Sequence, residues 1–117
     1  MADSIKIYHN PRCSKSRMTL QLLSERKIQP EVVQYLEHPP GRQALEDILN
    51  MLELEPRQLM RTHETEYKDN NLADESLSRD QLIDAIIAFP KLMQRPIVIN
   101  NGRAAIGRPP ENVLEIL

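Results

Sequence analysis

Ile5-Lys6-Ile7-Tyr8-His9-Asn10-Pro11-Arg12-Cys13-Ser14-Lys15-Ser16-Arg17 changes its pattern at the cysteine. Apolar and polar residues alternate over Ile5–Tyr8, which predicts a short β-strand. Good helix-forming residues follow from about Ser14 to Arg26, so a helix is expected there. Cys13 therefore stands where a strand gives way to a helix.

Cys13 is the only cysteine among the 117 residues. A free cysteine is most often a small, buried and inert residue. At a helix start, however, unpaired backbone N–H groups and the positive end of the helix dipole lower a thiol pKa. The chain also places Arg12, Lys15 and Arg17 nearby. We predict a reactive thiolate at a site that accepts an incoming oxyanion.

Composition limits the classes of fold and function. A chain of this length with 40% hydrophobic residues suits one compact domain over residues 1–117. A lone cysteine forms no internal disulfide, and the sequence shows neither a signal-peptide pattern nor a membrane-spanning run. We therefore expect a cytoplasmic protein without a membrane partner. A net charge of -2 and the absence of Trp argue against nucleic-acid binding, and we expect a monomer.

The middle of the chain combines a second strand with a helical segment. β-branched residues over Glu31–Leu36 predict a strand parallel to the first. Helical patterns then fill an insertion of about 41–92. It contains an amphipathic helix over Arg42–Leu52, a short helix opened by Pro56, and a helix behind the capping box Ser78–Gln81.

Two strands and a helix complete the pattern. Strands are predicted over Arg95–Ile99 and Arg103–Ile106, joined by a tight turn at Asn100-Asn101-Gly102. A last helix is expected from Pro109, with apolar residues that include Val113, Leu114 and Leu117 covering the sheet. The order β-α-β, helices, β-β-α predicts an α/β fold with a four-stranded mixed sheet.

Several separated motifs resemble those of the ArsC family of glutaredoxin-dependent arsenate reductases, and most closely its short YfgD-like branch. They are Ile7–Cys13 with Ser16-Arg17, Leu59-Met60-Arg61, Arg95-Pro96-Ile97-Val98 and Gly107-Arg108-Pro109. The resemblance runs over nearly the whole chain and implies a thioredoxin-like fold. In that fold the proline facing the active cysteine follows a cis bond, so Pro96 is expected to be a cis-proline.

The resemblance also implies a reaction. Cys13 would attack arsenate, while Arg61, Arg95 and Arg108 would hold the oxyanion and the arsenic adducts. Glutathione would add to the adduct as a co-substrate, and glutaredoxin would resolve it with release of arsenite. The residues agree, because a single thiol cannot supply two electrons by forming its own disulfide. Neither a bound cofactor nor a metal is expected.

The residues around Cys13 are expected to support it. His9 either lowers the Cys13 pKa as an imidazolium or orients the loop through a hydrogen bond. Asn10, Ser14, Ser16 and Arg17 are predicted to build the anion-binding turn, although Ser14 is alternatively only the helix N-cap.

Two other functions stay open at this level. Cys13-Ser14-Lys15-Ser16 has the form Cys-x-x-Ser, which also suits a monothiol glutaredoxin-like reductase. A non-enzymatic transcription regulator resembling the Spx group is the other alternative. Ser16 removes the Cys-x-x-Cys switch on which such regulators usually rely, so arsenate reduction is the function we favour.

Overall fold

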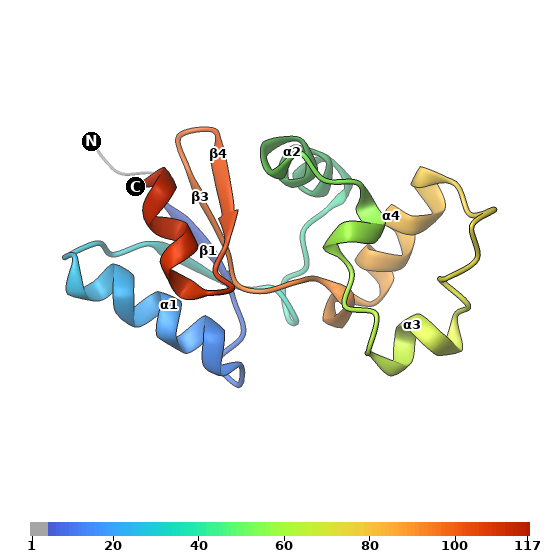
Figure 1. Ribbon diagram of the computed structural model, residues 1–117, viewed down its shortest axis with the longest axis horizontal. Helices are drawn as coiled ribbons and strands as arrows, with labels where there is room; N and C mark the ends of the chain where they lie inside the picture. Colours follow the sequence, from blue (N-terminus) through green and yellow to red (C-terminus); the bar gives the residue numbers. More distant parts are fainter. Residues whose placement is uncertain (1–4) are drawn as a thin grey trace. The chain divides into compact units, whose positions relative to one another are not determined.

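A computed structural model describes residues 5–117 (Figure 1). Residues 1–4, which belong to the stretch without a signal-peptide pattern, lie outside the described residues. The chain forms two compact units. One contains the described residues up to His38 together with Arg95–Leu117, and the other is Pro39–Gln94. That the whole chain is a single domain stays a prediction.

The first unit is built on a four-stranded mixed sheet of order β2-β1-β3-β4. Strand β1 (Lys6–His9) pairs in parallel with β2 (Glu31–Gln34) and antiparallel with β3 (Ile97–Asn100). Strand β3 pairs antiparallel with β4 (Arg103–Ile106). The predicted α/β fold with a mixed sheet is confirmed.

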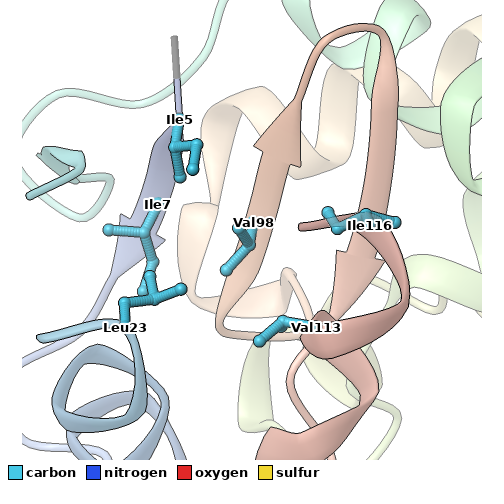
Figure 2. Close-up of a cluster of buried hydrophobic side chains, with 6 residues drawn as sticks. All are labelled: Ile5, Ile7, Leu23, Val98, Val113 and Ile116. Carbon is cyan, nitrogen blue, oxygen red and sulfur yellow. The ribbon is translucent and has the colours of Figure 1, made fainter. Parts of the chain in front are cut away.

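Helix α1 (Ser14–Glu25) and the 3-10 helix η3 (Pro110–Ile116) pack on one face of this sheet. Figure 2 shows the buried cluster that they form with the strands, which consists of Ile5, Ile7, Leu23, Val98, Val113 and Ile116. Burial of this apolar surface is a main source of stability in such a unit. It also anchors the two helices whose amino-terminal ends flank the site described below.

The chain enters β4 through the predicted tight turn. Both central residues have positive φ, 52° at Asn101 and 78° at Gly102. A two-residue hairpin turn that matches the strand twist requires this conformation, and Asn-Gly adopts it at low cost.

The last helix differs from the expected one. It is a 3-10 helix, in which residues three apart lie on the same side. Val113 and Ile116 are therefore buried together, whereas Leu117 is 37% exposed. The expectation that Leu117 covers the sheet was wrong.

The second unit is helical in its described elements. They are α2 (Arg42–Leu52), η1 (Pro56–Leu59), α3 (Thr65–Asp69), α4 (Arg79–Ala88) and η2 (Pro90–Leu92). The predicted capping box forms at α4: the Ser78 side chain accepts from the Gln81 N–H, and the Gln81 side chain accepts from the Ser78 N–H. Apolar side chains of α2 and α4 are buried, among them Ile48 and Ile83. Within residues 5–117, no helix has the length and apolar character that a membrane span requires.

Candidate active site

The reactive and charged side chains that could form a site in the first unit lie at one edge of the sheet, where β1 and β2 end. Because β1 and β2 are parallel, both of their carboxyl ends reach this edge. Strand β3 runs the opposite way and begins there, and β4 ends there. The edge thus receives the loop after His9, the residue after Gln34, and the segments beside Ile97 and Ile106.

Cys13 is the N-cap of α1. Its backbone is extended, with φ -93° and ψ 123°, and its carbonyl accepts the Arg17 N–H at 3.0 Å. Its own N–H donates to the Asn10 carbonyl at 3.0 Å, which closes the turn around Pro11. Ser14 is the first residue of the helix, so the alternative that Ser14 is the N-cap was wrong. The thiol is partly exposed and open to a reactant.

The surroundings of Cys13 favour a thiolate. Burial by itself raises the pKa of the thiol, but the Ser16 N–H and the side chains of Arg95 and Arg108 more than offset it, so the pKa is lowered. Arg108 Nη1 lies 3.8 Å from Cys13 Sγ. The stabilising guanidinium groups therefore come from the other end of the chain, and not from the residues next to Cys13 in sequence.

Arg95 and Arg108 are held side by side. Arg108 Nη1 donates to the Arg95 carbonyl at 3.0 Å. The bond expected to be cis, Arg95–Pro96, is cis in the structure, and Arg108–Pro109 is cis as well. The two arginines thus stand at equivalent places, each directly before a cis-proline at this edge.

Gly107 allows β4 to approach α1 and Pro96 closely. Its N–H donates to the Pro96 carbonyl at 2.9 Å. A Cβ atom at this position would lie 2.5 Å from Thr19 Oγ1 and 2.9 Å from Pro96 Cγ. Glycine is therefore required for the segment that carries Arg108 to lie against the segment that carries Arg95.

His9 acts on the loop through Ser16. Ser16 Oγ lies 2.6 Å from His9 Nδ1 and accepts the Asn10 N–H at 3.0 Å. Burial, and second the charge of Arg17, lower the pKa of His9, so its ring is neutral at neutral pH. The lowered pKa disfavours the imidazolium role, and the hydrogen bonds of Ser16 agree with the alternative, in which His9 orients the loop. The role of His9 toward Cys13 stays a prediction.

The other loop residues hold the turn together. Asn10 Oδ1 accepts the Arg12 N–H at 3.0 Å. Arg17 Nη1 donates to the Pro11 carbonyl at 3.0 Å. Ser14 is exposed at the start of α1. That these residues, with Ser16, also bind an anion stays a prediction.

Arg61 belongs to the second unit. Its Nε donates to Glu64 Oε2 at 3.1 Å, and Lys91 Nζ lies 3.8 Å from Glu64 Oε1. Its backbone N–H donates to the Leu92 carbonyl at 2.6 Å. That Arg61 joins Arg95 and Arg108 around one ligand stays a prediction.

Tyr35 was not predicted from the sequence as a residue of the site. This residue follows β2 directly, and its hydroxyl is buried. Burial raises its pKa most; the charge of Arg95 and the Asn10 side chain lower it, and the charge of Cys13 raises it. The predicted parallel pairing could have placed Tyr35 at the site. His9 is opposite Gln34, so the residues that follow them, Asn10 and Tyr35, reach the same edge of the sheet.

A cavity of about 270 Å³ opens beside the cysteine loop. It is lined by the loop before Cys13 and by the chain after β2, namely His9, Asn10, Pro11, Arg12, Gln34, Leu36 and Glu37. The edge therefore combines a partly exposed thiol whose pKa is lowered, two guanidinium groups, and a cavity beside the loop that precedes the thiol. This arrangement suits attack by sulfur on a bound oxyanion.

Comparison with known proteins agrees with this geometry. The model of the ArsC family matches residues 8–116. The chain belongs to the ArsC family. The predicted membership is thereby confirmed, and the thioredoxin-like fold of this ArsC chain is confirmed by solved relatives.

Individual relatives of this ArsC protein are similar over their full length. The uncharacterized protein YfgD of Escherichia coli K12 is 58% identical, covering 100% of this chain and 99% of its own. A protein named arsenate reductase from Neisseria meningitidis is 51% identical over 97% of both chains. The solved structure of the arsenate reductase from Vibrio cholerae superposes with a TM-score of 0.97 at 52% identity, covering 100% of both chains.

Proposed function

We propose that this protein reduces arsenate to arsenite, with Cys13 as the nucleophile and with glutathione and glutaredoxin as the source of electrons. The observation that carries the proposal is the pair Arg95 and Arg108 beside a thiol whose pKa is lowered. Relatives at 49–51% identity that are named arsenate reductases support the same reaction.

Arsenate needs this kind of site. It is a tetrahedral oxyanion with two negative charges near neutral pH, and a thiolate approaches it only when donors offset that charge. Guanidinium groups offset it best, because their N–H groups pair with two oxygens at once. Arg95 and Arg108 provide such groups at Cys13, and we propose that Arg61 adds a third.

The first step forms a bond between sulfur and arsenic. Cys13 Sγ attacks the arsenic atom, and one arsenate oxygen leaves as water after taking up protons. Arsenic stays pentavalent. The thiol of glutathione then displaces a second oxygen as water, so the arsenic carries both the Cys13 and the glutathione sulfur.

The second stage transfers the electrons. A glutaredoxin thiolate attacks the glutathione sulfur, and a mixed disulfide forms while the arsenic–sulfur electron pair passes to arsenic, which becomes trivalent. Water then replaces Cys13 on arsenic, arsenite leaves and the thiol is regenerated. In sum, arsenate and two thiols give arsenite, one disulfide and water. The single thiol of Cys13 suffices, because both electrons come from outside thiols.

The proposed reaction also indicates the cellular compartment in which the protein works. Glutathione and glutaredoxin act in a reducing compartment, so we propose that the protein works in the cytoplasm, as a monomer that meets its two thiol partners in turn. No bound metal or organic cofactor takes part in the proposed steps.

The direct test measures arsenite production by the purified protein with arsenate, glutathione and glutaredoxin. The wild type is expected to form arsenite steadily, and Cys13→Ser is expected to stay at the level of the reaction without protein. Omission of glutaredoxin is expected to stop turnover after the adduct stage. Equal arsenite formation by wild type and Cys13→Ser would refute the proposal. Reduction of protein–glutathione disulfides without arsenite formation would favour a monothiol reductase instead.

A further inference from the structure

The Tyr35 hydroxyl is buried, and within residues 5–117 no group lies in good hydrogen-bonding geometry with it. The side chain is 0% exposed, so water does not reach it freely. Buried hydroxyl groups in proteins are nearly always hydrogen-bonded, because an unpaired one loses its contacts with water and gains none in return. Its position therefore suggests a partner that is present only in a complex.

The neighbours of this hydroxyl define what that partner is. Arg95 lies close to it, and a guanidinium group has donors but no acceptor. The Asn10 side chain is also close, and it lowers the Tyr35 pKa, which is the effect of a group that donates to the phenol oxygen; its Oδ1 accepts the Arg12 N–H. The Tyr35 proton therefore lacks a committed acceptor, while the charge of Cys13 acts on the same group. An acceptor that is drawn to cations and sits next to Cys13 is an oxyanion.

We propose that the Tyr35 hydroxyl donates a hydrogen bond to the tetrahedral oxyanion bound at Cys13, beside Arg95 and Arg108. This inference rests on the proposed function in one respect, that the substrate is an oxyanion. Because burial raises the Tyr35 pKa, the hydroxyl keeps its proton at neutral pH and is a donor. Tyr35 then binds substrate, and the thiolate of Cys13 depends on other groups.

Alkylation of Cys13 by iodoacetamide measures oxyanion binding without requiring turnover. Arsenate bound over the thiol blocks alkylation, so the concentration that halves the rate gives its affinity. The wild type is compared with Tyr35→Phe, which removes only the hydroxyl, and with Tyr67→Phe, a control on α3 of the other unit. Because hydrogen bonds to charged groups are strong, Tyr35→Phe is expected to need about tenfold more arsenate, and Tyr67→Phe the wild-type amount.

The pH profile of alkylation without arsenate separates substrate binding from a purely structural role. If Tyr35 binds the oxyanion, Tyr35→Phe keeps the wild-type profile. A profile shifted to higher pH would mean that Tyr35 instead positions Arg95 against the thiol, and would overturn the proposal. Equal protection of wild type and Tyr35→Phe, or no protection of the wild type, would overturn it too. If arsenate protects the wild type but is not reduced, the proposed reaction fails while the role of Tyr35 is still decided by the two affinities.

Discussion

Arg108 Nη1 lies 3.8 Å from Cys13 Sγ although 95 residues separate them in the chain. The contact follows from the sheet: Cys13 comes after β1, and Arg108 comes after β4, at the edge where β3 begins. The same arrangement brings the Arg95 carbonyl within 3.0 Å of Arg108 Nη1. The charge that stabilises the thiolate is therefore set by strand pairing over the whole unit.

This contact predicts the effect of removing the Arg108 charge. In Arg108→Gln, the Cys13 pKa is expected to rise, because a guanidinium that favours the thiolate is lost. Alkylation by iodoacetamide at neutral pH should slow by roughly threefold or more, since only the thiolate reacts. The measurement is the alkylation rate as a function of pH.

Arg42→Gln serves as the control for this substitution. It removes the same charge from an exposed residue that is paired with Asp80 and Asp84 on the helical unit. Its alkylation profile should match the wild type. If Arg108→Gln gave the same profile as Arg42→Gln, the arginine would not act on the thiol.

The close packing at Gly107 predicts that Gly107→Ala destabilises the protein more than Gly41→Ala does. In Gly107→Ala, the new Cβ meets Thr19 Oγ1 at 2.5 Å and Pro96 Cγ at 2.9 Å, so the surrounding side chains must move. Such overpacking is expected to lower the free energy of unfolding by about 1–3 kcal/mol. In Gly41→Ala, no atom of residues 5–117 outside Gly41 and its two chain neighbours lies within 4 Å of the new Cβ, so the change should be small. Urea denaturation of both variants measures it, and equal stability of the two would contradict the close approach at Gly107.

The lowered pKa of His9 predicts that the free energy of unfolding depends on pH. Burial first and Arg17 second lower its pKa in the folded state below 6.5, the ordinary value that the unfolded chain retains. Between these two values the unfolded state binds more protons, so the free energy of unfolding falls as the pH falls. The contribution of His9 is fully present above 6.5 and is lost progressively down to its folded pKa.

Urea denaturation at several pH values between about 5 and 8 tests this dependence. This range extends about 1.5 units to either side of the ordinary histidine pKa. His9→Gln is expected to lose less stability on acidification than the wild type. The matched control, His38→Gln, replaces an exposed histidine that follows β2. An equally steep loss in His9→Gln and in the wild type would assign the pH dependence to other groups.

Local sequence patterns predicted much of this structure. Alternation gave β1, the Ser78–Gln81 box marked the start of α4, and Asn101-Gly102 marked the hairpin, because each of these depends on neighbours in the chain. The place of Cys13 at the start of α1 is local in the same sense.

Features that depend on tertiary structure were harder to predict. The lowered pKa of His9 results first from burial, which no pattern around residue 9 shows, and second from the charge of Arg17. From the sequence, Tyr35 is only one more residue of a predicted strand. The parallel register of β1 and β2 shows that Tyr35 and Asn10 follow paired residues and so lie at the same edge of the sheet. The burial of Ile116 in place of Leu117 depends on whether the last helix has three or nearly four residues per turn.

Arg61 allows substrate binding and thiolate formation to be separated. The lowered pKa of Cys13 is accounted for by the Ser16 N–H and by Arg95 and Arg108, against the opposing effect of burial. Under the proposed function, Arg61 acts on the oxyanion alone. In Arg61→Lys the charge stays but the planar fork is lost, so kcat/KM for arsenate is expected to fall by about tenfold or more.

Two measurements decide this prediction. Steady-state arsenite formation gives kcat/KM for Arg61→Lys and for the control Arg42→Lys, which should keep the wild-type value. The alkylation profile of Cys13 should be the same in both variants and in the wild type, because the groups that lower the thiol pKa are the Ser16 N–H, Arg95 and Arg108. An unchanged kcat/KM in Arg61→Lys would remove Arg61 from the oxyanion site. A fall in kcat/KM together with a shifted alkylation profile would show that Arg61 acts through the thiolate, and the three arginines would then form one coupled group.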